Sequence, residues 1–186
     1  MKKIITFIFL SLSIFCNGQN VSVEKTVFGI QTGFLGIWVH NESKLSNTIA
    51  LRSEVGLDSG FWGGDFYDGT GFLLTPVLTL EPRFYYNLNK RNSGSKDTRN
   101  NSGTFISLKT SYHPDWFVIS NYKDVNIITD ISFIPTWGVR RKIGTHFNYE
   151  TGFGIGYRYF FAKNAGYYSN ESDVAANLHV RIGYVF

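Results

Sequence analysis

The sequence predicts an all-β protein, a single antiparallel up-and-down transmembrane β-barrel of about eight strands. Apolar and polar residues alternate with a period of two in segment after segment of the 186-residue chain, as expected for strands with one polar face. The apolar positions carry Phe, Tyr, Trp, Leu and Ile, whereas the opposite positions carry Gly, Ser, Thr, Asn and charges. No stretch reaches the roughly 18 consecutive apolar residues that a membrane-spanning helix needs.

The first segment has the three parts of a secretory signal peptide. Residues 1–3 are positively charged, residues 4–15 carry no charge, and residues 16–19 are polar with a small Gly18. We expect cleavage after Gly18 or Gln19, so the signal peptide is 1–18 and the barrel domain is 19–186. The only cysteine, Cys16, then leaves with the peptide, which excludes disulfides and cysteine-ligated metals. The alternative is a lipidated Cys16, but the bulky Phe15 before it does not fit such a site.

Seven segments alternate strongly and are predicted as strands. They are residues 27–39, 47–58, 72–88, 104–112, 126–140, 146–160 and 174–186. Because single-chain outer-membrane barrels have an even number of strands, an eighth is needed, and residues 116–120 are the best candidate. With both termini periplasmic, turns at 113–115 and 142–145 are expected at the periplasmic end, and the polar stretches 89–103 and 162–173 at the extracellular end. This scheme leaves residues 59–71 as an unusually long periplasmic connection.

The charged residues of these segments share the face opposite to the large apolar side chains. If five of their cations faced lipid, the cost at ~2–4 kcal/mol each would exceed the net stability of most domains. The apolar face is therefore expected to meet lipid, and in the first segment it includes Phe28, Ile30, Phe34 and Trp38. The predicted interior network consists of Arg52, Glu54, Glu81, Arg83, Lys109, Asp130, Arg140, Glu150, Arg158, His179 and Arg181.

The last segment alternates from Leu178 up to a terminal aromatic residue. Val180, Ile182, Tyr184 and Phe186 resemble the C-terminal signal that the barrel-assembly machinery of Gram-negative bacteria recognises. With the signal peptide and the alternation, residues 20–186 resemble the small OmpA/OmpX-like outer-membrane β-barrel family. The resemblance implies a cell outer-membrane location, with outer-membrane lipid and the assembly machinery as partners. We expect a monomer. The family implies no single activity.

The interior charges predict a non-enzymatic barrel with a structural or surface-interaction role and no cofactor. An eight-stranded barrel is only wide enough for side chains, and buried charges must be paired. A small porin-like pore for ions or small solutes is the first alternative, because Gly152, Gly154 and Gly156 leave room on the same face. A lipid-modifying enzyme is the second, because His179 beside Glu150 has the composition of a general base, although no catalytic triad motif is recognisable.

The remaining histidines do not form a metal-binding pattern. His40 with Glu42 and Ser43 is expected in a polar turn, and His113 and His146 in other turns. None has a second ligand at close spacing, so no metal site is predicted.

Two further features concern partners and fold. The net charge of +4 is mild and dispersed, which argues against nucleic-acid binding. The aromatic cluster within residues 61–67 is expected to anchor the barrel at the headgroup level, with a partner or glycan contact as the alternative. A soluble calycin-like barrel, whose core would be the aromatic face, is the alternative fold.

Overall fold

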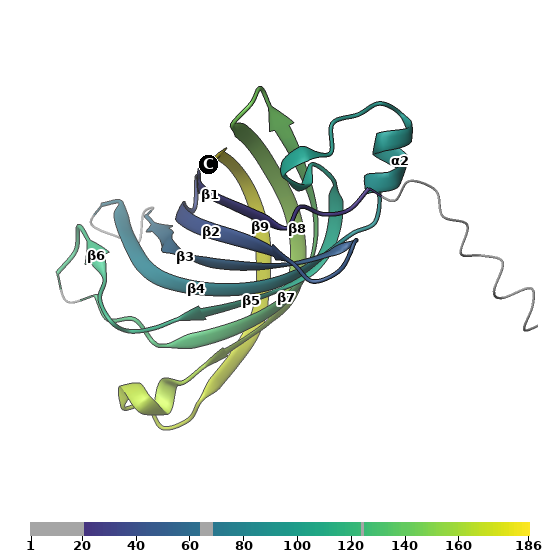
Figure 1. The fold of residues 1–186 in the computed structure, drawn as a ribbon. Coiled ribbons are helices and arrows are strands. Elements are labelled where there is room, and N and C mark those ends of the chain that lie inside the picture. The colour runs from purple at the N-terminus through teal and green to yellow at the C-terminus, as the bar shows by residue number, and fades with distance from the viewer. Residues whose placement is uncertain (1–20, 64–68, 124) are drawn as a thin grey trace, which may run out of the picture.

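The computed structural model describes residues 21–63, 69–123 and 125–186. The predicted signal peptide and Cys16 lie outside the described residues, as do residues 64–67 of the 61–67 aromatic cluster. Nine strands form one antiparallel sheet that closes in a ring (Figure 1). The predicted all-β barrel architecture is therefore confirmed.

Eight strands make the wall, and a ninth, β6, is only two residues long. The strands are β1 (Thr26–Gly33), β2 (Gly36–Lys44), β3 (Ile49–Trp62), β4 (Gly71–Tyr85), β5 (Thr104–His113), β6 (Ile119–Ser120), β7 (Asp130–Ile143), β8 (Phe147–Phe160) and β9 (Glu171–Val185). Short helical segments are α2 (Leu88–Ser93), η1 (Arg99–Asn101) and η2 (Ala162–Ala165). Each long strand pairs with its neighbours along the chain, and β1 pairs with β9 to close the ring. This is the predicted up-and-down order.

The eighth wall strand comes from the first predicted segment. That segment is a hairpin of β1 and β2, in which Gly33 pairs with Gly36 across a turn at residues 34–35. Gly36 has a φ of 144°, a conformation that glycine adopts without steric cost. The prediction of one strand over 27–39 was wrong because the apolar pattern runs through the turn as Phe34 and Leu35. The turn also reverses the parity, so Trp38 lies inside, 3% exposed, rather than outside.

The predicted strand at 116–120 was also wrong. Only Ile119 and Ser120 form a strand there, and this β6 pairs with Leu74 and Leu73 of β4. It is a short extension of the sheet beyond the end of β5. The barrel thus has an even number of wall strands without it.

The two ends of the barrel carry different connections. One end, here called the base, carries residues 21–25, the β2–β3 and β7–β8 turns, residues 86–103 and Phe186. The other end, here called the mouth, carries the β1–β2, β3–β4, β5–β7 and β8–β9 connections. Figure 1 shows α2 at the base and β6 and η2 at the far end. The predicted ends for 142–145 and 162–173 match this arrangement. Residues 59–71, 89–103 and 113–115 lie at the ends opposite to those predicted. The prediction counted one strand too few before β3, which reversed the expected directions of β3, β4 and β5.

Three prolines lie within the wall strands without a break in the ring. Each lies where the ladder on one side of its strand is interrupted. The β4–β5 pairing skips Pro82, and the β7–β8 pairing skips Pro135. Pro76 falls between the residues of β4 that pair with β6 and those that pair with β5. A residue without an N–H therefore leaves few ladder hydrogen bonds unmade.

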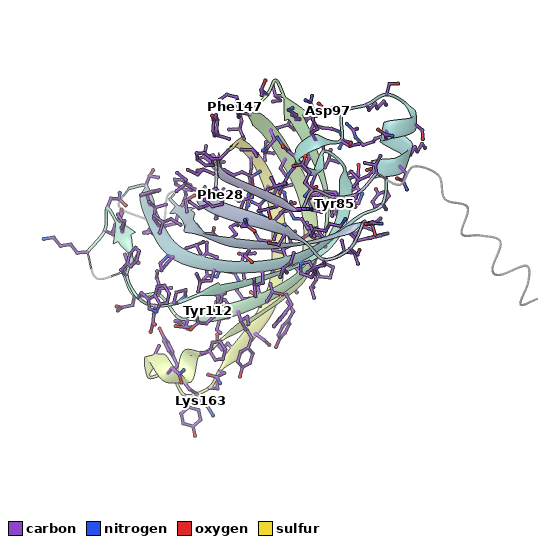
Figure 2. The ribbon with its side chains drawn as sticks, in the orientation of Figure 1. Phe28, Tyr85, Asp97, Tyr112, Phe147 and Lys163 are labelled. Carbon is purple, nitrogen blue, oxygen red and sulfur yellow. The ribbon has the colours of Figure 1, made fainter. Side chains whose placement is uncertain are left out.

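The outer surface is covered with large apolar side chains. Figure 2 shows Phe28, Tyr112 and Phe147 on the outside of the ribbon, and outward positions of every wall strand carry exposed rings or aliphatic groups. The interior has the opposite composition, since most of its buried side chains are polar or charged. This arrangement inverts the usual order of a water-soluble domain.

The base is closed by an apolar cluster. Val23, Ala50, Tyr85, Leu88 and Phe105 pack together there, with the Tyr85 and Phe105 rings 5.5 Å apart. Leu88 belongs to α2, so this short helix and the chain before β1 are both fixed to the inside of the wall. The interior therefore has no open path through the base at this cluster.

Candidate functional site

The centre of the barrel holds a cluster of arginines and glutamates, here called the ion cluster. Its members are Arg52, Arg83, Arg140, Arg181, Glu42, Glu54, Glu81 and Glu150, all buried. They come from six wall strands, in two runs of three neighbours: β2, β3 and β4, and β7, β8 and β9. Period-two alternation turns each of them inward, because successive side chains of a strand point to opposite faces of the sheet.

Glu42 of β2 lies at the base side of the ion cluster. Its Oε1 is 3.1 Å from Arg83 Nη1 and 2.7 Å from Arg140 Nη2. Its Oε2 accepts hydrogen bonds from the Tyr85 hydroxyl at 3.0 Å and from Asn101 Nδ2 at 2.9 Å. A single carboxylate thus joins two arginines to the apolar cluster that closes the base.

Asn101 connects the base to this carboxylate through an unusual backbone. Asn100 and Asn101 have φ of 55° and 56°, in the left-handed region that asparagine tolerates better than most residues. The turn aims the Asn101 amide into the barrel, where its Oδ1 also accepts the Glu24 backbone N–H at 2.8 Å. The segment before β1 is held by the same side chain that contacts Glu42.

Glu150 of β8 is the second carboxylate shared by several arginines. Arg83 donates to its two oxygens at 2.8 Å each, and Arg140 Nε donates at 2.8 Å. Arg83 also pairs with Glu81 at 2.7 Å and lies over the Phe105 ring at 4.2 Å. Each charge has several opposite partners, which offsets the cost of removing it from water.

A third set of contacts links β1, β2 and β3 to β9, the last strand. Glu54 of β3 pairs with Arg52 and with Arg181 of β9, the latter at 2.9 Å. The Arg181 guanidinium also lies 3.8 Å from the centre of the Trp38 ring. Arg52 further donates to Gln31 Oε1 at 2.7 Å. The ion cluster thus connects strands from both halves of the chain across the interior of the barrel.

Above the ion cluster, towards the mouth, the interior opens into a cavity of about 510 Å³, here called the cup. Arg181 and His179 lie at its ion-cluster side, and residues 126–128 lie at its mouth side. More than half of the residues that line the cup are polar or charged, and its volume falls in the size range of small-molecule sites.

One side of the cup is organised by His113. Its Nδ1 lies 3.0 Å from Asp130 Oδ1, and its Nε2 lies 3.1 Å from Asp58 Oδ2. Asp58 also accepts the Trp38 indole N–H at 2.6 Å. Asp130 also lies 3.4 Å from Arg158 Nε. Both carboxylates of the cup are therefore engaged by donors from other strands.

Lys109 also lines the cup. Its amino group makes no hydrogen bond or ion pair with the residues that the structure describes. The same is true of the two Nη atoms of Arg158, whose ion pair uses Nε. The cup therefore presents unengaged cationic donors beside carboxylates that already accept hydrogen bonds.

The predicted interior residues all point into the barrel, but not into one group. Arg52, Glu54, Glu81, Arg83, Arg140, Glu150 and Arg181 belong to the ion cluster. Lys109, Asp130, Arg158 and His179 line the cup, where Lys109 and Arg158 are half-buried. The signal residues Val180, Ile182, Tyr184 and Phe186 lie on the outer face of the last strand and beyond its end, with exposed side chains.

His179 has the carboxylate neighbour that the sequence predicted. Its Nε2 lies 3.5 Å from Glu150 Oε1, and its Nδ1 lies 3.2 Å from Asn177 Nδ2. Within the described residues neither ring nitrogen contacts a hydroxyl group. A serine nucleophile needs such a contact to lose its proton to the histidine, so this geometry does not support the lipid-modifying enzyme as a function of His179.

Three interior residues were expected in turns instead, although the alternation contained the signal for two of them. His40 and Glu42 were expected in a turn but are buried in β2, 1% and 0% exposed. Counting period two backwards from the β2–β3 turn would have placed both inside. His113 was likewise expected in a turn but lies inside β5. Asp58 joins it through a contact between distant strands that no sequence pattern carries.

Outside the wall, one carboxyl has a clearly shifted acidity. Hydrogen bonds from the Arg99 guanidinium, with Nη2 2.6 Å from the carboxylate, lower the pKa of Asp97 to about 2. Asp97 lies between α2 and η1 at the base, and Arg99 is the first residue of η1, so the pair stabilises a surface turn.

Comparisons with protein-family models, curated proteins and solved structures find no match to this chain. Among the described residues, no three His, Cys, Asp or Glu side chains are grouped so as to hold a metal ion. In the same part of the chain, no helix has the length and apolarity to cross a membrane.

Proposed function

We propose that this protein is a non-enzymatic outer-membrane β-barrel with a structural or surface-interaction role, exposing its mouth to the outside of the cell. The observation that carries the proposal is the inverted distribution of side chains. The outer face carries exposed Phe, Tyr, Trp, Leu, Ile and Val on every wall strand, while arginines and glutamates are buried. Soluble monomers rarely expose continuous apolar areas larger than a few hundred Å².

The dimensions of the wall support the same proposal. β3, β7 and β8 have 14 residues each, and β4 and β9 have 15. A tilted membrane-spanning strand needs about 9–11 residues. A closed ring also satisfies the backbone groups that a lipid core cannot hydrate.

The filled interior favours a structural or binding role over conduction. Arg52, Arg140, Glu42 and Glu150 have no accessible side-chain surface, and the apolar cluster at the base lies below them. An ion entering the cup therefore meets paired charges rather than a water-filled path. Moving those pairs apart would leave charges unpaired at a cost of several kcal/mol.

The test combines location and conductance. The protein is expressed in a Gram-negative host, and outer-membrane fractions are run on gels with and without boiling. We expect a band in this fraction that changes mobility on boiling, because folded barrels resist SDS. A periplasmic, unshifted band would overturn the membrane proposal. The refolded protein is then added to planar bilayers, where reproducible channel steps that Arg83→Ala enlarges would favour the pore instead.

A further inference from the structure

The barrel wall is lower on one side of the mouth. β9 pairs with β1 only from Arg181 to Val185, so the β1-facing edge of its first ten residues has no neighbour among the described residues. On the other side, β2 pairs with β3 only up to Asp58. The short hairpin of β1 and β2 thus leaves a gap between β9 and the end of β3, here called the notch.

The close approach of two backbones fixes where the notch begins. A side chain on Gly33 would collide with the Val180 carbonyl oxygen, so glycine permits the last contact of β1 with β9. Beyond this point the chain turns back at Phe34 and Leu35, whereas β9 continues for nine more residues towards its start at Glu171.

The cup reaches the outside through the notch. Its lining includes Leu35 at the bottom of the notch, Ser59 and Gly60 on the β3 side, and Ala176 and Leu178 on the β9 side. Ala176 and Leu178 point outward, whereas their neighbours Asn177 and His179 point inward. The lining of the cup thus follows the part of β9 whose β1-facing edge has no paired strand.

The lips of the notch are apolar and strongly exposed. Val174, Leu178 and Val180 are 69–73% exposed, and Phe34 is 80% exposed. In the paired part of the wall, outward Leu108 is 43% and Val55 61% exposed. Phe34 stacks on Phe61 of β3 with ring centroids 5.3 Å apart, which gives the β3 side an aromatic lip.

The height of the wall at the notch matches a membrane's apolar layer. β2 has nine residues, and at about 3.3 Å per residue and a 45° tilt it rises roughly 21 Å. The apolar band of outer-membrane barrels is about 25 Å tall. The notch therefore starts within this band, a step that rests on the proposed membrane location.

We propose that the cup binds a single-chain amphiphile with an anionic head group, taken up sideways from the membrane through the notch. The head group lies in the cup, where Lys109 and the Nη atoms of Arg158 supply unengaged donors. The hydrocarbon chain lies between the lips formed by Phe34, Leu35 and Leu178. The cup volume is enough for the head and the first part of a chain, and the notch lets the remainder extend outward.

The charge arrangement selects the head group. Asp58 and Asp130 each lie within hydrogen-bond distance of His113, so both carboxylates of the cup are already engaged before a ligand enters. The amino group of Lys109 and the Nη atoms of Arg158 have no hydrogen-bond acceptors among the described residues. A carboxylate or a phosphate monoester would supply them, with charge-assisted hydrogen bonds stronger than neutral ones.

The experiment uses a palmitic acid analogue with a photoreactive group in its chain, added to the protein refolded in lipid nanodiscs. We expect labelling at the notch lips, located by mass spectrometry and suppressed by excess palmitate. Dodecyl phosphate competing better than palmitate would identify a phosphate head, and the reverse a carboxylate. Dodecanol, which lacks the anionic head, should not compete.

The variants separate the site from general lipid contact. Lys109→Met should lower labelling at least tenfold, whereas Lys163→Met, on the exposed η2, should leave it unchanged. If Lys109→Met does not fold, Leu178→Trp narrows the notch and should also lower labelling, with Leu108→Trp as the matched outward control. Labelling spread evenly over the outer face, or undiminished by Lys109→Met or Leu178→Trp, would overturn the proposal. A heat-modifiable band in the same sample keeps that failure distinct from failure of the membrane proposal.

Discussion

Glu42→Gln is expected to cause a large loss of stability from one isosteric change. The carboxylate holds Arg83 and Arg140 within 3.1 Å and accepts two further hydrogen bonds from Tyr85 and Asn101. The glutamine keeps the volume but leaves one positive charge uncompensated. Removing one partner of a buried ion pair costs about 3–5 kcal/mol.

The assay is urea unfolding of the refolded protein, followed by tryptophan fluorescence and by the heat-modifiable gel band. With a slope of about 2 kcal/mol per molar urea, the midpoint of Glu42→Gln should fall by roughly 2 M. Glu171→Gln is the matched control, because Glu171 is exposed at the start of β9 and should change stability by less than ~0.5 kcal/mol. Equal midpoints for the two variants would refute the reasoning that the ion cluster depends on this carboxylate.

Three further outcomes are expected. Gly33→Val should prevent closure of the ring, because its side chain meets the Val180 carbonyl, and should yield little heat-modifiable protein; normal yield would contradict this contact. Asn101→Ala should destabilise the fold by about 1–3 kcal/mol and speed amide exchange in α2, and unchanged exchange would show that the base is held otherwise. The Asp97 carboxyl should titrate by NMR at about pH 2. The stability that its ionised form adds is therefore present above the unfolded pKa of 3.8 and is lost as the pH falls towards 2. Arg99→Gln should return the titration midpoint towards 3.8.

The strand pattern was predictable wherever alternation was uninterrupted. Six wall strands, β3, β4, β5, β7, β8 and β9, follow the predicted segments, and parity placed Arg83 and Glu150 inside without knowledge of their partners. The hairpin of β1 and β2 was not predictable, because Phe34 and Leu35 continue the apolar pattern through a turn that has no polar residue. The inward position of Glu42 in β2 was missed for the same reason.

The cup and the notch could not be predicted from any local pattern. They depend on a difference in length between strands that meet only when the ring closes, eight residues in β1 against 15 in β9. The convergence of His113 with Asp58 likewise depends on residues 55 positions apart. Alternation shows on which face of the sheet a residue lies. The register between strands around the closed ring decides which residues lie at the same height along the barrel axis.

The pairing of the first strand with the last has a consequence for the order of folding. Arg181 reaches Glu54 across 127 positions, and Gln31 reaches Asn148 across 117. Until the ring closes, neither of these two contacts can form, and the groups keep part of their water. Desolvation of the interior must therefore coincide with ring closure, which predicts a slow, concerted final step without a partly dry intermediate, as expected for a topology dominated by distant contacts.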